Sequence, residues 1–258
     1  MRLPDLPRLA ASSHELPLWP PLLATRGPGS QSSLHAHHAM HLALAVHGTL
    51  RVRTEQTAAW VSGAGVLTAP DAKHAIDARG TDVLLVFFDP ESAVGVSLLP
   101  ALDGAVRSLT AEERDALTND ADPTAIVRAD GAAYTRRLAT TLGAAAPAPR
   151  PVHPKVRRVL RLLQTGAPDS DRSLEALADA VGLSAGRLMH VFTESIGIPL
   201  RPYLAWLKLQ RAAAAIVSGQ SLSSAAAAAG FVDAGHMTRT FKRMFGVSPS
   251  ELRPAGSH

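Results

Sequence analysis

Histidines are the residues in this 258-residue chain whose types and spacing could do chemistry. Six of the 11 histidines lie between His35 and His74. The pattern His35-x-His37-x3-His41 places side chains two and four positions apart, which share one face of a β-strand, and His74 would come from another strand. Neutral imidazole is a good ligand for Zn, Ni, Cu, Co or Fe(II) and a poor one for Ca or Mg. The spacing therefore predicts a divalent transition-metal site formed by His35, His37, His41 and His74.

The alternative is that these histidines line a pocket for a small organic molecule, or are satisfied by hydrogen bonds within the protein. The chain contains no cysteine, which excludes thiolate metal sites, catalytic thiols and disulfides. A metal held by this protein must therefore use His, Asp or Glu, and we expect no other cofactor.

A second set of candidate residues lies in an internal repeat near the C-terminus. Aligning this region on itself gives a period of 49, which pairs Leu188 with Met237 and Phe192 with Phe241. In each copy a short helix, a glycine-containing turn and a second helix opened by Ser or Asp are expected. This order is typical of a helix-turn-helix unit.

The second helix of each copy has an outward face that could contact DNA. Helical periodicity buries Leu188 and Phe192 in the first copy, and Met237 and Phe241 in the second. The outward candidates are Gly186, Arg187 and His190 in the first copy, and Gly235, His236, Thr238, Arg239, Lys242 and Arg243 in the second. Arg, His and Thr can contact base edges, whereas Lys242 and Arg243 would lie near phosphates. A solvated helix face is the alternative for one copy alone, and the shared period argues against it.

One further helix, over residues 199–218, should join the two units. At 1.5 Å per residue it spans roughly 28 Å, near one turn of B-DNA at ~34 Å. The two candidate reading helices could therefore enter successive segments of the major groove.

Three segments carry a family resemblance. They are Ser173-Leu-Glu-Ala-Leu-Ala-Asp-Ala-Val-Gly-Leu-Ser, then Gly230-Phe231, then Phe241-Lys-Arg-Met-Phe-Gly-Val-Ser-Pro-Ser-Glu-Leu-Arg253. Together they resemble the DNA-binding domain of AraC/XylS-family transcriptional regulators. The resemblance implies binding to double-stranded promoter DNA, usually with activation through contact with RNA polymerase.

The histidine region carries a second resemblance. Its histidines, with Gly29 and Gly48 around them and Gly65 and Pro70 before His74, are similar to the two motifs of the cupin fold. His41 stands where the cupin motif usually has glutamate. Many AraC-family sensor domains are cupin-like, so the two resemblances support each other and imply a metal or small-molecule effector.

The elements that must position these residues suggest a two-domain α+β protein. We expect a cupin-like β-barrel sensor in residues 1–100, with strands between 33 and 88 after an irregular arm in 1–30. A helical extension should follow in 101–143, a proline-rich linker in 144–154, and an all-α double helix-turn-helix domain in 155–258. The charge supports this division, because residues 151–258 hold 13 Lys and Arg against 7 Asp and Glu, a basic balance that suits nucleic acid.

Two features of the helical extension predict helices. Thr110-Ala-Glu-Glu is a capping-box-like helix start, and Tyr134, Leu138 and Leu142 recur every four residues. Such a stripe usually packs within its own domain. A helix that forms a homodimer is the alternative.

The sequence thus predicts a transcriptional regulator, acting as a homodimer, whose sensor domain responds to a metal or small molecule. A cupin metalloenzyme of dioxygenase type with a DNA-binding tail is a second hypothesis. No acid–base pair or arginine cluster accompanies the histidines, so we expect no enzymatic activity. A constitutive regulator with a vestigial cupin is the third. No signal peptide or apolar run of ~20 residues is visible, so no membrane association and a cytoplasmic location are expected.

Overall fold

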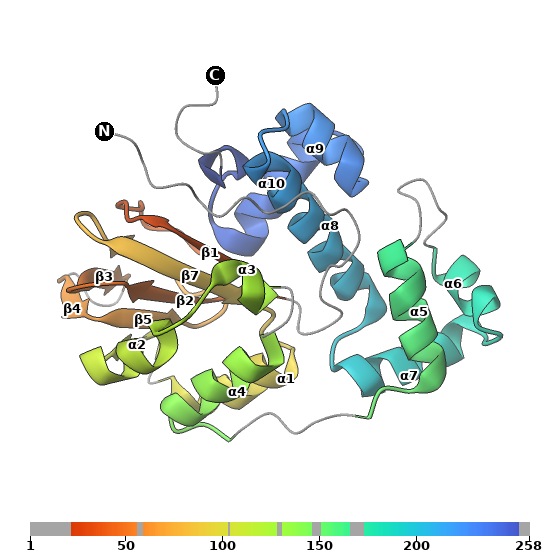
Figure 1. Cartoon of the computed structure of the whole chain (residues 1–258), viewed down its shortest axis with the longest axis horizontal. Helices are drawn as coiled ribbons and strands as arrows, with labels where there is room; N and C mark the ends of the chain where they lie inside the picture. The colour runs from red at the N-terminus through yellow and green to blue at the C-terminus, as the bar shows by residue number, and fades with distance from the viewer. Residues whose placement is uncertain are drawn as a thin grey trace.

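The computed structural model describes residues 22–55, 59–102, 104–127, 131–145, 151–165 and 173–252. It has a sheet-containing N-terminal part and an all-helical C-terminal part (Figure 1). The two-domain α+β organisation predicted from the sequence is therefore present. None of the helices in the described ranges combines the length and the apolar character needed to span a bilayer.

Two antiparallel sheets form the N-terminal part. The first has five strands in the spatial order β1 (Leu22–Pro28), β7 (Asp82–Phe88), β2 (Met40–Ala45), β5 (Gly65–Thr68) and β8 (Val106–Leu109). The second has three, in the order β4 (Val61–Gly63), β3 (Leu50–Thr54) and β6 (His74–Asp77). No strand pairing joins the two sheets within the described residues, so the predicted closed cupin-like barrel is not confirmed.

Two sequence expectations about this part are wrong. Leu22–Pro28, expected in an irregular arm, is a strand that pairs with β7 along its whole length, while the rest of that arm up to residue 21 lies outside the described residues. Val106–Leu109, expected in the helical extension, is a strand that pairs with β5. In each case a short segment is extended because a neighbouring strand supplies its hydrogen bonds, a tertiary effect that outweighs local pattern.

Alternation along β2 sets the two faces of the larger sheet. Leu42 and Leu44 pack on the helices that follow the sheet, whereas Ala43 and Ala45 pack against the smaller sheet. The small alanine side chains occupy the side on which the two sheets meet. The N-terminal part is therefore a sandwich covered by helices on one side.

The helices of the N-terminal part are α1 (Ala93–Leu98), η1 (Leu99–Ala101), α2 (Ala111–Thr118), α3 (Pro123–Ala125) and α4 (Gly131–Thr141). The predicted capping box is confirmed, because the Thr110 side chain accepts from Glu113 N and the Glu113 carboxylate accepts from Thr110 N. Tyr134, Leu138 and Leu142 are buried in the same core as the strand residues of the larger sheet. The four-residue stripe therefore packs within its own domain, and these side chains are not available for a dimer contact.

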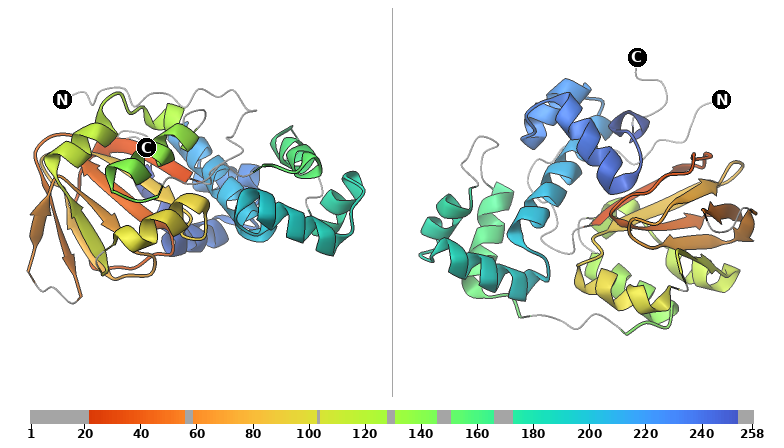
Figure 2. Two further views of the ribbon diagram at one scale, coloured as in Figure 1. Left: turned by 90° about the horizontal axis from the view of Figure 1, so that it is seen from below. Right: turned by 180° about the vertical axis from the view of Figure 1, so that it is seen from behind.

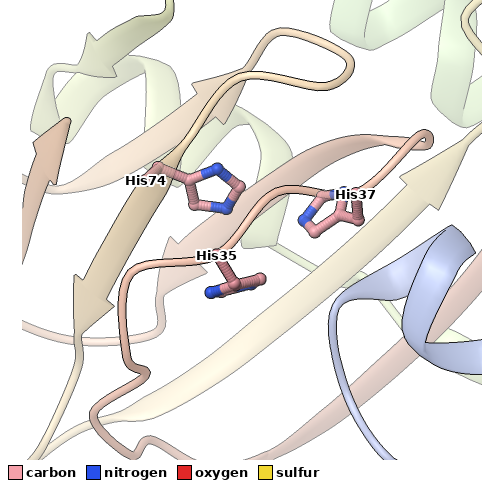
Figure 3. A group of neighbouring side chains, drawn as sticks. All are labelled: His35, His37 and His74. Atoms are coloured by element: carbon pink, nitrogen blue, oxygen red, sulfur yellow. The ribbon is translucent and has the colours of Figure 1, made fainter. Parts of the chain in front are cut away.

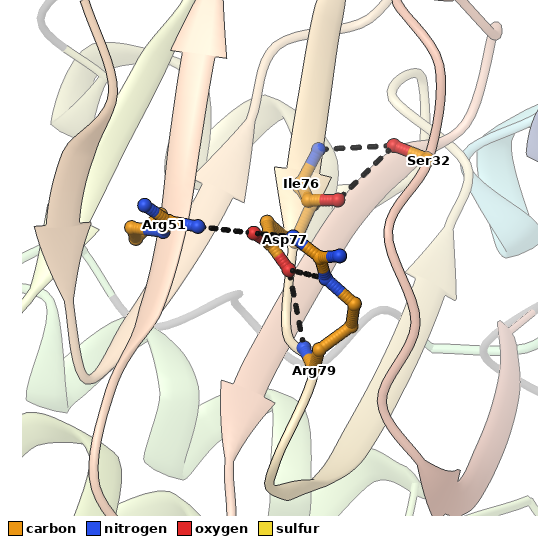
Figure 4. Close-up of polar contacts among 5 residues, drawn as sticks. All are labelled: Ser32, Arg51, Ile76, Asp77 and Arg79. Carbon is orange, nitrogen blue, oxygen red and sulfur yellow. Dashed lines mark hydrogen bonds and ion pairs between the residues drawn. The ribbon is translucent and has the colours of Figure 1, made fainter.

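An irregular segment before β2 is tied to the edge of the smaller sheet. Ser32 N donates to Ile76 O at 2.8 Å, and Ile76 N donates to Ser32 Oγ at 2.9 Å. These two hydrogen bonds form a clamp at Ser32. Next to it, the buried Asp77 carboxylate accepts hydrogen bonds from the Arg79 and Arg51 guanidinium groups, which hold the pKa of Asp77 well below its usual range (Figure 4). These bonds fix where the chain runs between residues 31 and 35.

The C-terminal part contains α5 (Pro154–Thr165), α6 (Leu174–Ala180), α7 (Ala185–Ile196), α8 (Leu200–Val217), α9 (Leu222–Ala229), α10 (Ala234–Phe245) and η3 (Pro249–Leu252). The predicted pairs of helices, α6 with α7 and α9 with α10, agree with the structure to within about two residues at each end. Each pair encloses a glycine of positive φ, Gly182 at 62° and Gly230 at 77°. Glycine adopts this backbone conformation without a steric cost, which explains its place in both turns.

The second helix pair lies against the N-terminal part, whereas the first lies away from it (Figures 1 and 2). Helix α8 also joins the two parts, through two buried hydrogen bonds. The Trp206 Nε1–H donates to Asp89 Oδ2 at 2.7 Å, and the Gln210 amide donates to Leu22 O at 2.6 Å. Phe87 belongs to the same apolar cluster as the helices of the C-terminal part. One core therefore continues across the boundary between the two parts.

The Tyr134 hydroxyl gives a test of the helical packing. It is buried and no described residue hydrogen-bonds to it, and burial raises the pKa of this phenol well above its usual range. Tyr134 also lines a cavity of about 340 Å³ together with Asp120, Asp122 and Arg137. Removing an unpaired buried hydroxyl is expected to be neutral or stabilising by up to about 1 kcal/mol.

We therefore expect Tyr134→Phe to leave the denaturation midpoint unchanged or to raise it by a few degrees. Leu138→Ala, on the same helix face, is the contrast and should destabilise by about 2–5 kcal/mol through the cavity it creates. A loss of stability in Tyr134→Phe comparable to that in Leu138→Ala would show that the hydroxyl has a partner.

Candidate functional site

Three of the four predicted histidines converge at one end of the sandwich. His35, His37 and His74 each offer a ring nitrogen, and these nitrogens all lie within 4.8 Å of one another. Figure 3 shows His74 projecting from β6 and the other two from the segment before β2. The group is one that could hold a metal ion after small side-chain adjustments.

The histidines do not meet through the regular strand that the sequence predicted. His35 and His37 do not lie on a regular strand, since β2 begins only at Met40. Instead His35 forms a single antiparallel bridge to His74, in which each backbone N–H donates to the other residue's carbonyl, at 3.0 and 2.9 Å. The bridge places two of the histidines directly opposite each other on neighbouring segments.

The Nδ1 atom of each of the three rings contacts a backbone carbonyl two residues away. The distances are 2.7 Å from His35 to Ser33 O, 2.8 Å from His37 to Ala39 O and 2.8 Å from His74 to Ala72 O. A carbonyl only accepts, so each Nδ1 carries the proton and each Nε2 is left with a free lone pair. Metal-binding histidines are oriented by this kind of bond from the second ring nitrogen.

Burial keeps the imidazoles of His37 and His74 neutral. Desolvation, followed by the repulsion of neighbouring histidines, lowers the pKa of His37 to about 3, and desolvation lowers that of His74 to about 4. The Nε2 atoms of both rings are buried and have no hydrogen-bond partner among the described residues. Two unprotonated, unpartnered nitrogens that face a common space are suited to donate electron pairs to a metal.

His41 is placed differently from the other three. It lies on β2, and its ring stacks on Phe87 with the centroids 4.4 Å apart. Its ring centroid is 5.5 Å from that of His37, and it is not part of the group whose nitrogens lie within 4.8 Å. Both of its ring nitrogens are buried and have no hydrogen-bond partner in the described part of the chain, and burial holds the pKa of His41 well below its usual range. We call His35, His37 and His74 the histidine cluster. His41 borders this cluster and is not part of it.

The C-terminal end of α10 closes the cluster from outside, a feature that the sequence analysis missed. His38 N donates to Arg243 O at 3.0 Å, and Ala39 N donates to Met244 O at 3.1 Å. Gly246, the C-cap of α10, sits so close that a Cβ there would lie 2.5 Å from His35 Nε2. No local pattern in the sequence relates residue 246 to residue 35, so only the tertiary structure could reveal this contact.

The candidate DNA-contacting residues of α7 are placed as predicted. Ser184 caps the helix by accepting from Arg187 N, while Leu188, Val191 and Phe192 are buried. Gly186, Arg187 and His190 are exposed. His190 Nε2 lies 3.1 Å from Glu194 Oε1, so an acidic side chain shares this face.

The face of α10 agrees with the prediction except at Thr238. Gly235, His236, Arg239, Lys242 and Arg243 are exposed. Thr238 is half-buried and its hydroxyl donates to Ala234 O at 2.8 Å, which leaves it less accessible than predicted. Gly235 leaves room for the Arg239 guanidinium, because a Cβ there would lie 3.3 Å from Arg239 Nη1.

Two exposed apolar side chains border these faces and were not among the predicted residues. Val232, in the turn before α10, is 87% exposed, and Met189 on α7 is 48% exposed. Apolar side chains beside a reading helix can contact thymine methyl groups. Periodicity does not predict the exposure of a turn residue such as Val232, whereas Met189 lies on α7, where the helical period could have shown it.

Comparisons with known proteins agree with this description of the C-terminal part. Residues 177–255 match the family model of a helix-turn-helix domain. Over 107 residues, 40% of this chain, the sequence is 30% identical to the arabinose operon regulatory proteins of Escherichia coli (strain K12) and Salmonella typhimurium. The C-terminal part is thus similar to a helix-turn-helix domain and to a segment of these regulatory proteins. The match spans only about a third of those relatives, 36% and 37% of their lengths.

Solved structures also resemble the chain. A structure of ToxT from Vibrio cholerae covers 89% of this chain and 95% of its own, with 10% sequence identity and a TM-score of 0.47.

The low pKa values predict how the metal-free protein responds to acid. His37 and His74 titrate near pH 6.5 when unfolded but only near pH 3 and 4 when folded, so between these values the unfolded state binds more protons. The free energy of unfolding should be fully retained above about pH 6.5 and should fall below it, by on the order of 1 kcal/mol per pH unit for each histidine. Chemical denaturation between pH 7 and pH 5, in the presence of a chelator, measures this slope.

His74→Leu should reduce the slope, whereas His47→Leu, at an exposed position, should leave it unchanged. A wild-type stability that does not vary over this range would contradict the neutral, buried state of His37 and His74.

Proposed function

We propose that this protein is a DNA-binding transcriptional regulator whose N-terminal domain senses a divalent transition metal or a small molecule. The observation that carries the proposal is the pairing, in one chain, of a helix-turn-helix domain with a cluster of three histidines that could hold a metal ion. The arabinose operon regulatory proteins, which match this domain, are regulators by name. We therefore propose a regulatory role, and not a catalytic one, for the whole chain.

The exposed faces of α7 and α10 support DNA binding. Each has arginine and histidine side chains near the start of the helix, where reading helices contact base edges in the major groove. Lys242 and Arg243 in the last turn of α10 suit phosphate contacts. The 18 residues of α8 span about 27 Å, which is compatible with two units that occupy neighbouring turns of the duplex.

The chemistry of the cluster supports a transition metal as the signal. Imidazole nitrogens with no carboxylate among them favour Zn, Ni, Cu, Co or Fe(II) over Mg or Ca. The residues present fit such an ion, because the Nε2 atoms of His37 and His74 are buried with no partner among the residues that the structure describes, and all three rings are oriented by their Nδ1 bonds. His35, His37 and His74 would hold it, and His41 is available as a further ligand if its ring turns away from Phe87.

The remaining partners complete the proposal. Double-stranded promoter DNA and RNA polymerase would be the macromolecular partners, in the cytoplasm, where a bacterial-type promoter is read. A homodimer is also proposed, although the stripe of Tyr134, Leu138 and Leu142 cannot form its contact, since it is buried within the chain.

Metal content tests the sensor part of the proposal. The purified protein should bind about one transition-metal ion per chain, as a three-histidine site with an open position would. Replacing His35, His37 and His74 together by Ala should abolish this binding, measured by elemental analysis after dialysis against zinc. His41→Ala should weaken it less, because His41 lies outside the cluster.

His47→Ala is the matched control and should bind metal as the wild type does. An unchanged metal content in the triple variant would remove the proposed site and would favour a small organic effector.

Substitutions on the exposed helix faces test the DNA-binding part. Arg187→Ala and Arg239→Ala should each weaken binding by about 1–3 kcal/mol, the usual worth of a base contact. The measurement is a gel-shift titration on a duplex selected by the wild-type protein from a random pool. Arg157→Ala removes the same charge from the exposed face of α5 and serves as the control.

Equal affinity of all three variants and the wild type would contradict the assignment of the reading faces. A similar loss in all three would indicate attraction by net charge alone.

A further inference from the structure

The chain segment that carries two of the cluster histidines also caps α10. Within five residues, His35 and His37 supply two rings of the cluster, and His38 N and Ala39 N donate to the carbonyls of Arg243 and Met244. Ala39 is bonded in both directions, because its carbonyl contacts His37 Nδ1 while its N–H donates to the helix. A change that orders the rings would therefore also order the two amides that hold the end of α10.

The contact between the cluster and α10 is too close for most residues. Gly246 lies against both rings, and a Cβ at this position would be 2.8 Å from His37 Cδ2 as well as 2.5 Å from His35 Nε2. Glycine is suited to this position twice over, since its φ of 72° also ends the helix in the left-handed conformation. Next to it, the ring of Phe245 packs against Phe87, with the centroids 5.0 Å apart.

Electrostatics gives the coupling a direction. The C-terminal end of a helix carries a partial negative charge and attracts cations. A cation held by the cluster would lie beside this end of α10, whereas the side chains of Lys242 and Arg243 are exposed, where solvent screens their charge. Metal binding should therefore favour the docked position of α10.

We propose that metal binding at the histidine cluster and docking of the second helix-turn-helix unit onto the N-terminal domain are coupled, with α10 as the movable wall of the metal site. This inference rests on the proposed metal-sensing function and adds its route to the DNA-binding domain. It implies that a bound metal ion holds the second reading helix against the sandwich, and that loss of the metal releases it. The first unit, α6 and α7, lies away from the sheets and is not held in this way (Figure 2).

Trp206 reports on docking from a position outside the cluster. Its indole N–H donates to Asp89 Oδ2 across the domain contact and is buried there. This proton can exchange with solvent only when the two parts separate locally, so its exchange rate measures the undocked population. The exchange of this indole proton would be followed by nuclear magnetic resonance of the full chain.

The experiment compares exchange of the Trp206 indole proton with and without zinc. In the wild-type protein, zinc should slow the exchange by on the order of three- to tenfold, and a chelator should reverse the effect. His74→Leu removes a ligand that comes from β6, and not from the segment bonded to α10, and should abolish the zinc effect. His47→Leu, at an exposed position, should retain it.

A second comparison tests the wall itself. Gly246→Ala should accelerate exchange of the indole proton, because its Cβ forces α10 away from His35. Gly197→Ala is the matched control at the C-cap of α7, where φ is 93°, so it carries the same left-handed strain in the other unit. Exchange that is equal in the two variants would overturn the role given to Gly246.

The outcomes separate this inference from the proposed function. If zinc binds, with a dependence on His74, but indole exchange is unchanged or faster, the metal site stands and the coupling is wrong. If no zinc binds, the metal-sensing function fails and the coupling fails with it. Slower exchange in the wild type and in His47→Leu, but not in His74→Leu, supports the coupling.

Discussion

The close approach of α10 to the imidazole of His35 is the constraint on which the domain arrangement depends. Only a residue without a Cβ allows the backbone at position 246 to lie against two rings. The same glycine ends α10 by adopting the left-handed backbone conformation. The amides of His38 and Ala39 then satisfy carbonyls that the end of a helix would otherwise leave without partners. The bonds from Trp206 and Gln210 extend the same contact along α8.

The histidine cluster lies at an end of the sandwich that the sheets leave open, and the docked helix α10 explains why His37 and His74 are buried there. The two sheets leave the end uncovered, and α10, Phe245 and Gly246 cover it. The cluster is therefore bounded by both parts of the chain. A ligand there contacts the domain that would read DNA without any long pathway through the core, which makes a coupling free energy between the two sites physically direct.

The helical part was predictable because its determinants are local. Capping residues such as Ser184 and Asp233, glycines in the turns and a 3.6-residue apolar period specify each helix from neighbours a few positions away. The repeat with a period of 49 then showed the same pattern of helix, glycine-containing turn and second helix in two copies. Three of the four histidines predicted to meet lie close together, but the expected strand and the closed barrel are not found, because β-pairing depends on segments far apart in the chain.

The sequence by itself determined the chemical character of this protein: imidazoles without thiolates in the N-terminal half, and two helix-turn-helix units with basic, exposed faces at the other end. Tertiary structure alone decided which histidines meet, because the bridge between His35 and His74 and the clamp at Ser32 join segments that have no local relation. It also decided that His41 stacks on Phe87 and that Gly246 closes the cluster. Local rules specify helices and side-chain chemistry, whereas a site shared by distant segments arises only from how the folded parts pack.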